Sequence, residues 1–175
     1  MSALWVGGRA AASDERVLAP MTTAHLDGVM AVETAAYAFP WTRGNFIDSL
    51  AAGYPAYVLL DARGQLLGYF IAMPGVDEMH LLNITVAPAE QGRGHARCLI
   101  NALIPLCHDH AARELWLEVR QSNERAHAMY LRLGFSAVGV RKGYYPAPLG
   151  RREDALVMSL KLGAAAQQGA ADALE

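Results

Sequence analysis

Short runs of apolar and β-branched residues recur along the chain and predict seven β-strands. Their expected bounds are residues 16–19, 57–60, 66–72, 79–86, 114–119, 135–141 and 154–160. The clearest run is 79–86, which ends in Leu-Leu-Asn-Ile-Thr-Val and is soon followed by Pro88. Because proline has no backbone N–H to give to a strand ladder, we expect the strand to stop before it. The residues Asp-Ala-Arg-Gly at 61–64 predict a hairpin between the second and third strands.

Apolar residues at the spacing of one helix face predict four helices. They run from Thr22 or Thr23 to about Tyr37, over the segment that Thr42 caps, over residues 94–110 and over residues 124–133. Asn123 can cap the fourth helix through its side chain, and Gly134 should end it in the left-handed conformation. Pro105 lies inside the third predicted helix and should kink it by removing one backbone hydrogen bond.

Composition predicts a soluble protein with one domain. The 175 residues are 53% hydrophobic and 18% charged, which is enough for one sizeable core. The net charge of −2 argues against a general nucleic-acid binder. No apolar run approaches the roughly 20 residues that span a membrane, and no signal-type apolar segment opens the chain. Cys98 and Cys107 are spaced as neither a metal motif nor a disulfide framework, so we expect a reducing, cytoplasmic location.

The two ends of the chain differ from its middle in composition. Residues 1–15 are rich in small side chains, and residues 163–175 are rich in alanine. We expect a loose leader at 1–15, a folded domain at 16–162 and a flexible tail at 163–175.

The segment Gln-Gly-Arg-Gly-His-Ala-Arg at 91–97 stands between the buried strand 79–86 and the third predicted helix. At a helix start several backbone N–H groups have no partner and the helix dipole is positive. Gly92 and Gly94 let a ligand approach the backbone closely, while Arg93, His95 and Arg97 add positive charge. The segment therefore predicts a site for a pyrophosphate.

Three interpretations of this segment compete. The simplest is an ordinary loop with a helix cap. A dinucleotide fingerprint of the form G-x-G-x-x-G is disfavoured, because Arg97 occupies the third glycine position and the glycines do not follow the strand directly. The third interpretation is the pattern Gln/Arg-x-x-Gly-x-Gly/Ala, which Gln91, Gly94 and Ala96 match. That pattern resembles the coenzyme A motif of the GNAT N-acetyltransferases.

Three residues of the second half are candidates for chemistry. Glu118 points away from Leu115 and Leu117 on its predicted strand, Asn123 begins a helix, and Tyr130 lies two turns into that helix. Considered one at a time, a glutamate such as Glu118 is most often a solvated or paired charge, Asn123 is most simply a helix cap, and a helical tyrosine such as Tyr130 is most often a packing residue. The histidines have no zinc-site spacing and no serine has a nucleophile-elbow setting, so metal and covalent-serine chemistry are not expected.

Longer stretches resemble the GNAT family, and within it the bacterial ribosomal-protein-alanine N-acetyltransferases. The resemblance covers about residues 16–162. It is carried by Phe39-Pro40-Trp41, Asn83-Ile84-Thr85-Val86, Pro88, residues 91–97, residues 115–123 with Ala126, Tyr130 and Leu133-Gly134-Phe135, Tyr144-Tyr145-Pro146, and Gly150-Arg151 with Glu153-Asp154-Ala155. It implies an α/β GNAT fold. In that fold a mixed, mostly antiparallel sheet splays after its central strand and carries helices on both faces.

The resemblance also implies a role for each matching residue. The backbone of Ile84, Thr85 and Val86 would hold the acetyl carbonyl and pantetheine. Glu118 matches the proton acceptor and Tyr130 the proton donor. Further coenzyme contacts are implied for Gln91, Gly92, Arg93, Gly94, His95, Ala96, Arg97 and Asn123. The substrate groove would be bordered by Phe39, Trp41, Tyr144 and Tyr145, although simple packing is an equal alternative for Phe39 and Trp41. Acetyl-CoA would be the co-substrate, and no metal is needed.

An amine attacks a thioester only when it is neutral. At pH 7 an α-amino group, with a pKa near 8, loses its proton more easily than a lysine, with a pKa near 10.4. The resemblance implies acetyl transfer to a protein N-terminal alanine, that of small-subunit ribosomal protein eighteen, and we expect no nucleic-acid or membrane partner. The alternatives are other protein N-termini, a lysine or a small amine as acceptor, or a non-catalytic coenzyme A binding module. A dinucleotide oxidoreductase is more distant, and the oligomeric state stays open.

Overall fold

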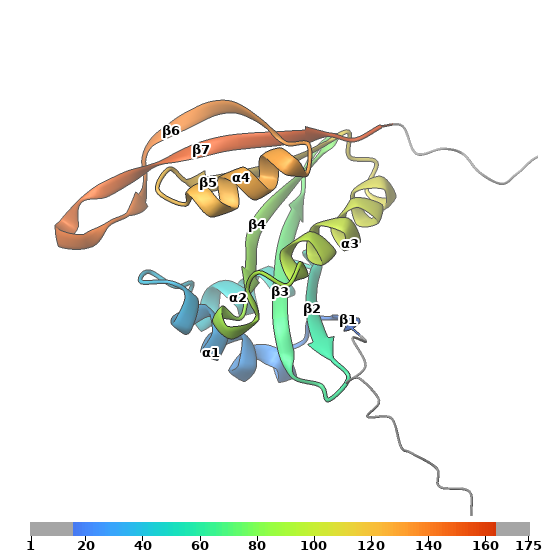
Figure 1. Cartoon of the computed structure of the whole chain (residues 1–175). Coiled ribbons are helices and arrows are strands. Elements are labelled where there is room, and N and C mark those ends of the chain that lie inside the picture. Colours follow the sequence, from blue (N-terminus) through green and yellow to red (C-terminus); the bar gives the residue numbers. More distant parts are fainter. Residues whose placement is uncertain (1–15, 164–175) are drawn as a thin grey trace, which may run out of the picture.

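The computed structural model describes residues 16–163, in which seven strands form one sheet (Figure 1). The order across the sheet is β1-β2-β3-β4-β5-β7-β6. The strands are β1 (Arg16–Pro20), β2 (Ala56–Asp61), β3 (Leu66–Pro74), β4 (Glu78–Val86), β5 (Glu114–Arg120), β6 (Ser136–Pro146) and β7 (Arg152–Lys161). Only β4 and β5 pair in parallel within this sheet, and every other neighbouring pair is antiparallel. The predicted mixed, mostly antiparallel sheet is confirmed.

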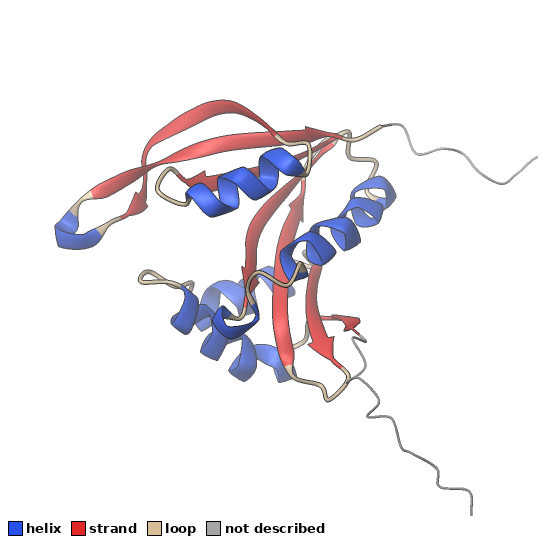
Figure 2. Cartoon of the chain, in the orientation of Figure 1, coloured by secondary structure: helices blue, strands red, loops and turns tan. Residues whose placement is uncertain are grey.

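Helices cover both faces of the sheet, as Figure 2 shows. They are α1 (Leu26–Ala36), α2 (Arg43–Ala51), α3 (His95–Asp109) and α4 (Glu124–Arg132), with short 3-10 turns at Thr23–His25, Pro88–Glu90 and Pro148–Gly150. Helices α1 and α2 pack on one face, which we call the α1 face, and α3 and α4 pack on the other, the α3 face. The first predicted helix is divided into a 3-10 turn at Thr23–His25 and the α-helix α1, which follows it.

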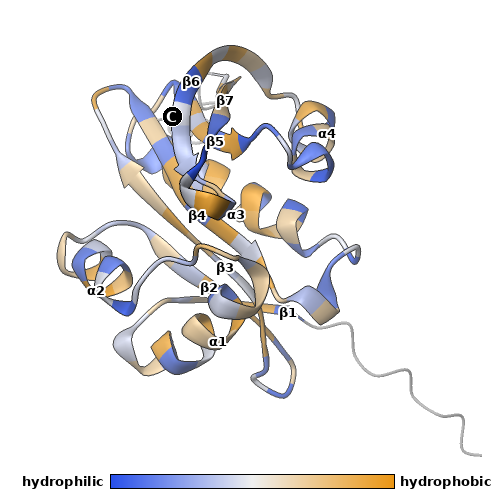
Figure 3. Cartoon of the chain, turned by 90° about the vertical axis from the view of Figure 1, so that its left-hand side faces the viewer, coloured by the Kyte–Doolittle hydropathy of each residue, from blue (hydrophilic) through white to orange (hydrophobic). Residues whose placement is uncertain are grey.

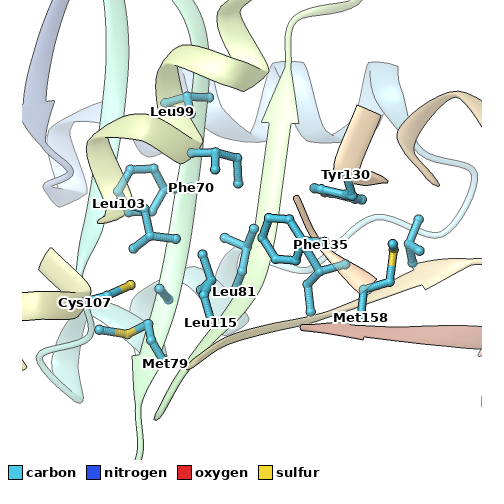
Figure 4. Packing of buried hydrophobic residues seen from close by; sticks show 14 of the residues in the cluster. Phe70, Met79, Leu81, Leu99, Leu103, Cys107, Leu115, Tyr130, Phe135 and Met158 are labelled. Carbon is cyan, nitrogen blue, oxygen red and sulfur yellow. The ribbon is translucent and has the colours of Figure 1, made fainter. Parts of the chain in front are cut away.

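Each face has its own hydrophobic cluster, so the sheet is buried on both sides. On the α3 face, Leu99 and Leu103 of α3 pack near Phe70 of β3, and Tyr130 and Phe135 lie nearby (Figure 4). On the α1 face, Phe46 of α2 packs its ring edge-on against Tyr69 of β3, with ring centroids 5.7 Å apart. Figure 3 shows hydrophobic stretches along the central strands and α3, whereas α2 and α4 mix hydrophilic and hydrophobic residues.

A β-bulge in β4 sets the geometry of the centre. Ile71 of β3 pairs with Asn83 and the next residue, Ala72, pairs with Leu81, so Leu82 is the extra residue. Such a bulge changes which side chains face each side of a strand. Here Leu82 and Thr85 face α1, while Ile84 and Val86 pack toward α3.

Beyond the bulge, β4 and β5 separate. Their parallel pairing covers only Glu78–Leu81 against Glu114–Leu117, although β4 continues to Val86 and β5 to Arg120. The two strands diverge visibly in Figure 1. The predicted splay after the central strand is therefore confirmed, and one edge of β4 is left without a strand partner.

The structure corrects one local expectation. We expected the sixth strand to end at residue 141, but β6 continues to Pro146, and Tyr145 pairs with Glu153 of β7. Gly143 has a φ of 57° and lies at an irregularity in the pairing between Arg141 and Tyr145. Pro105 lies inside α3, as expected from the predicted helix over 94–110, and the kink at this residue stays a prediction. The expected leader at 1–15 and the tail from residue 164 onward lie outside the described residues.

Candidate active site

A cavity of about 1160 Å³ opens where β4 and β5 diverge. It is lined by residues of α1, of the loop after α1, of β4, of the segment that starts α3, and of β5, α4 and β6. The structure thereby brings together all the site residues predicted from sequence except Arg93. Those that line the cavity are Phe39, Trp41, Ile84, Thr85, Val86, Gln91, Gly92, Gly94, His95, Ala96, Arg97, Glu118, Asn123, Tyr130, Tyr144 and Tyr145.

One end of the cavity is the glycine segment before α3. Gly92 and Gly94 have φ values of 82° and 80°, in the left-handed region that glycine adopts without strain. Gly94 immediately precedes α3, so the free N–H groups of the first helical turn lie beside it. A side chain built on Gly94 would meet nothing within 4 Å, so this part of the segment is open to a ligand.

The charge of this segment differs from the prediction. The Arg93 guanidinium is paired with Glu90 at 2.9 Å. The His95 ring is only 5% exposed, and burial lowers the pKa of His95, so the ring is neutral near pH 7. The expectation that His95 supplies positive charge is wrong, because its side chain is buried. Arg97, in contrast, is exposed and lines the cavity.

Arg125 replaces part of the missing charge, and the sequence pattern did not identify it. Its Nη1 lies 3.5 Å from Oε1 of Gln91, and a Cβ on Gly92 would come within 3.2 Å of its Nη2. Gln91 in turn donates from Nε2 to the carbonyl of Val86 at 3.3 Å. The first turn of α4 thus contributes a cation above the glycine segment. The sequence signal that could have identified Arg125 is its position, two residues after the Asn123 cap in the first turn of the fourth helix.

The unpaired edge of β4 presents backbone groups to the cavity. The Tyr37 hydroxyl lies 3.2 Å from the carbonyl of Ile84, which therefore faces away from β3. The carbonyl of Val86 faces the same way, because Gln91 reaches it. Since the N–H and C=O of one residue in an extended strand point to the same side, the Ile84 and Val86 N–H groups also face the cavity. Thr85 lies between them, and its backbone position pairs with Tyr69 of β3.

Glu118 lies on the α1 face of β5. Its neighbours Leu117 and Val119 are buried in the cluster on the α3 face, so the predicted alternation along this strand is confirmed. The Glu118 carboxylate is paired with Arg141 of β6 at 3.3 Å, and its side chain is 18% exposed. The Tyr145 hydroxyl donates to the backbone carbonyl of Glu118 at 3.0 Å. These contacts fix Glu118 at the edge of the gap.

Tyr130 borders the same gap from the α3 face. It is 5% exposed and packs edge-on against Phe135, with ring centroids 5.5 Å apart. Burial raises the pKa of Tyr130 well above its usual value, so the phenol keeps its proton at neutral pH. Glu118 and Tyr130 therefore reach one cavity from opposite faces of the sheet.

Aromatic residues and Arg120 border the cavity on the α1 face. Phe39 is 42% exposed, whereas Trp41 packs against Phe46 with ring centroids 5.4 Å apart. The Arg120 guanidinium lies 4.4 Å from the ring centroid of Tyr145 and 5.9 Å from that of Phe39. The loop after α1 and strand β6 therefore meet through Arg120, which the sequence analysis had not singled out.

Asn123 acts as a helix cap, which was one of its two predicted roles. Its side-chain oxygen accepts a hydrogen bond from the Ala126 N–H at 3.1 Å. The side chain also lines the cavity, and its coenzyme contact stays a prediction.

Two further findings concern other classes of site. Within residues 16–163, no three His, Cys, Asp or Glu side chains are grouped so that they could bind a metal ion. In the same part of the chain, no helix combines the length and apolar character that crossing a bilayer requires.

Comparison with known proteins gives a consistent result. Residues 26–135 match the acetyltransferase (GNAT) family. The [ribosomal protein bS18]-alanine N-acetyltransferase of Haemophilus ducreyi is 37% identical over 131 residues, which cover 75% of this chain and 90% of that protein. The enzyme of the same name from Escherichia coli K12 is 35% identical over 145 residues, or 83% of this chain and 97% of that protein. The crystal structure of the ribosomal-protein-S18-alanine N-acetyltransferase from Escherichia coli superposes with a TM-score of 0.78 at 33% identity, covering 89% of this chain and 99% of that one.

Proposed function

Because the chain belongs to the acetyltransferase (GNAT) family, we propose that it acetylates the α-amine of a protein that begins with alanine. We propose acetyl-CoA as the donor and ribosomal protein bS18 as the acceptor. The names of the Haemophilus and Escherichia relatives support this acceptor. The observation that carries the proposal is a single cavity that joins a glycine segment at a helix start to an aromatic border across the gap between β4 and β5.

The donor end of the cavity suits coenzyme A. The backbone of Gly92 and Gly94 and the start of α3 would hold its pyrophosphate, with Arg97 and Arg125 as cations. The unpaired edge of β4 would hydrogen-bond the pantetheine amides, much as an added strand does. When bound, acetyl-CoA supplies an acetyl thioester that an amine can attack. The residues present therefore fit the group.

Three proton and charge roles fall to groups at the gap. Glu118 accepts the proton that the α-ammonium must lose to become an attacking amine, directly or through water. The Ile84 or Val86 N–H, on the open edge of β4, stabilises the negative charge that forms on the acetyl oxygen. Tyr130 donates its phenolic proton to the departing sulfur, a role that fits a tyrosine held protonated by burial. The reaction needs no covalent intermediate on the protein, since proximity brings the two substrates together.

The two substrates would reach the gap from opposite faces. The glycine segment and Arg125 are on the α3 face, whereas Phe39, Tyr145 and Arg120 are on the α1 face with Glu118. An extended peptide end can lie between the aromatic side chains and place its α-amine beside Glu118. A lysine side chain would bring a higher pKa, so it should react poorly at pH 7.

The test uses two synthetic peptides and mass spectrometry. One peptide has the first residues of bS18 with a free N-terminal alanine, and the other has the same sequence with its α-amine blocked and its lysines free. With acetyl-CoA at pH 7 we expect acetylation of the first peptide on its α-amine and almost none of the second. Equal labelling of both peptides, or activity confined to a small polyamine, would contradict the N-terminal assignment.

Two coarser proposals accompany this one. We propose that residues 16–162 form the catalytic domain, which is supported by the family match over 26–135 and by continuous elements from β1 to β7. We also propose a cytoplasmic location, where newly made ribosomal proteins are accessible. Fractionation of cells that produce the tagged chain tests the second proposal directly.

A further inference from the structure

A fully buried carboxylate lies beside the cavity and has no part in the mechanism above. Glu33 of α1 is 1% exposed. Its Oε1 accepts a hydrogen bond from the Trp41 N–H at 2.8 Å, and its Oε2 accepts hydrogen bonds from the Tyr69 hydroxyl and, at 3.3 Å, from the Asn83 amide. Both carboxyl oxygens accept hydrogen bonds, and all three donors are neutral groups. Burying a carboxyl group is costly, and its place here calls for an explanation.

A chain of hydrogen bonds leads from Glu33 to the edge of the cavity. Thr85 donates from Oγ1 to Oδ1 of Asn83 at 2.8 Å. The Tyr37 hydroxyl lies 2.9 Å from Oγ1 of Thr85 and 3.2 Å from the carbonyl oxygen of Ile84. Tyr37 is the residue just after α1, is 37% exposed and lines the cavity. The chain therefore connects a buried carboxyl group to a partly exposed hydroxyl beside the open edge of β4.

The acceptor role of Glu33 sets the direction of every hydrogen in this chain. Because Oε2 of Glu33 accepts, the Asn83 NH₂ faces Glu33 and its carbonyl oxygen faces Thr85. That oxygen has no hydrogen and takes the single hydroxyl hydrogen of Thr85. The Thr85 oxygen can then only accept a hydrogen bond, so the Tyr37 hydroxyl hydrogen points toward the Thr85 oxygen and the Ile84 carbonyl. A lone pair of the Tyr37 oxygen therefore stays free to accept a hydrogen bond from a molecule in the cavity.

We propose that the Tyr37 oxygen accepts a hydrogen bond from an N–H of the attacking α-amine, and that Glu33 is the positioning residue that orients Tyr37 for this task. The inference rests on the proposed function, and it names Tyr37 as the residue that binds the α-amine of the peptide. With one N–H held by Tyr37 and a proton removed by Glu118, the nitrogen lone pair is directed across the gap. Burial raises the pKa of Tyr37 and the charge of Glu33 contributes in the same direction, so the phenol stays protonated.

Three variants test the chain. Tyr37→Phe removes the acceptor, and Thr85→Val removes the middle link at nearly constant volume. Glu33→Gln should reverse the chain: the introduced side-chain amide would face Asn83, the Asn83 amide would turn over, and Thr85 would donate to Tyr37. We expect each variant to lower kcat/KM for the alanine peptide by up to about tenfold, the size expected for the loss of one hydrogen bond. The KM for acetyl-CoA should not change.

A double-mutant cycle distinguishes positioning from a merely structural role. If Glu33 acts through Tyr37, then Glu33→Gln or Thr85→Val should cause little further loss of kcat/KM in the Tyr37→Phe background. Peptide affinity in the presence of coenzyme A, measured by fluorescence anisotropy, should weaken in the same non-additive way. Tyr57→Phe is the matched control, because its ring stacks on Phe70 and does not line the cavity.

Wild-type turnover of the alanine peptide is measured first and tests the proposed function by itself. If the wild type is active and Tyr37→Phe retains its full kcat/KM and peptide affinity, the inference is wrong and the proposed function stands. Independent, additive losses for Glu33→Gln and Thr85→Val in the Tyr37→Phe background would also overturn it. If Glu33→Gln does not fold, Thr85→Val still decides the question.

Discussion

The guanidinium of Arg120 lies 4.4 Å from the ring centroid of Tyr145, and the same group donates to the carbonyl of Pro146 at 3.0 Å. It also lies 5.9 Å from the ring centroid of Phe39, across the opening of the cavity. Glu153 of β7 holds Arg120 in place through a 3.0 Å ion pair. One arginine of β5 therefore joins the loop after α1 to the end of β6, the two parts of the proposed peptide groove.

Arg120→Met should weaken peptide binding without affecting the coenzyme. Methionine keeps much of the volume of the side chain but loses the cation–π contacts and the hydrogen bond to Pro146, which are worth about 1–3 kcal/mol together. We expect the KM for the alanine peptide to rise about tenfold and the KM for acetyl-CoA to stay constant in steady-state assays. Arg63→Met, in the exposed hairpin turn between β2 and β3, is the control. A parallel rise of both KM values would indicate a general loss of structure instead.

Acetyl-CoA should raise the melting temperature, because any ligand that binds only the native state stabilises it. Gly94→Glu should abolish this shift, since it places a negative side chain in the proposed pyrophosphate site. Gly64→Glu is a matched control, because Gly64 has a φ of 79°, close to the 80° of Gly94, and both have open space around a built Cβ. The two variants should lose similar stability without ligand, and only Gly94→Glu should lose the response in differential scanning fluorimetry. A ligand-induced shift that survives in Gly94→Glu would contradict the assignment of the glycine segment.

Acid should destabilise the β6–β7 region through Glu153. Hydrogen bonds from Ser122, followed by the contact with Arg120, hold the pKa of Glu153 below its ordinary value of 4.5. A carboxyl with a lowered pKa in the folded state contributes stability above its unfolded pKa and loses it as the pH falls through the folded value. Thermal melts between pH 6 and pH 3 should show stability falling below about pH 4.5, with a smaller fall in Glu153→Gln. An identical pH dependence in wild type and variant would contradict this account.

Much of this architecture could be predicted from sequence, because the strands and helices follow strong apolar patterns with clear end signals. The alternation of Leu115, Leu117 and Val119 placed Glu118 on the opposite face, and burial confirms it. The bulge at Leu82 could not be predicted, since nothing in Leu-Leu-Asn-Ile-Thr-Val marks the extra residue. That bulge turns Asn83 and Thr85 toward α1 and makes the Glu33 chain possible.

Other parts of the site depend on contacts between distant segments. Tyr37 and Ile84 are 47 residues apart, and Arg120 and Pro146 are 26 apart. Nothing in the local sequence distinguishes Glu33, whose burial depends on its contacts with Tyr69 of β3 and Asn83 of β4. Likewise, the prediction of a positive charge on His95 was wrong, because local sequence does not reveal which face of a helix start is buried.

The proposed proton carriers, Glu118 and Tyr130, give the most direct test of the mechanism. Glu118→Gln and Tyr130→Phe should each lower kcat by roughly 10²–10⁴-fold at pH 7, the usual contribution of general acid–base catalysis. Coenzyme binding should survive in both, because neither residue belongs to the glycine segment. Tyr57→Phe, outside the cavity, controls for the loss of a tyrosine hydroxyl.

The pH dependence of the two variants should then separate the base from the acid. An α-amine has a pKa near 8, so its neutral fraction rises steeply between pH 6 and pH 8 without help from the protein. The deficit of Glu118→Gln relative to wild type should therefore shrink as the pH rises to 9. The deficit of Tyr130→Phe should not shrink, because the departing sulfur still lacks its proton donor. Initial rates at saturating peptide and acetyl-CoA measure both deficits. If the Glu118→Gln deficit is constant from pH 6 to pH 9, Glu118 does not act as the base; if Tyr130→Phe recovers at high pH, its role as the acid is wrong.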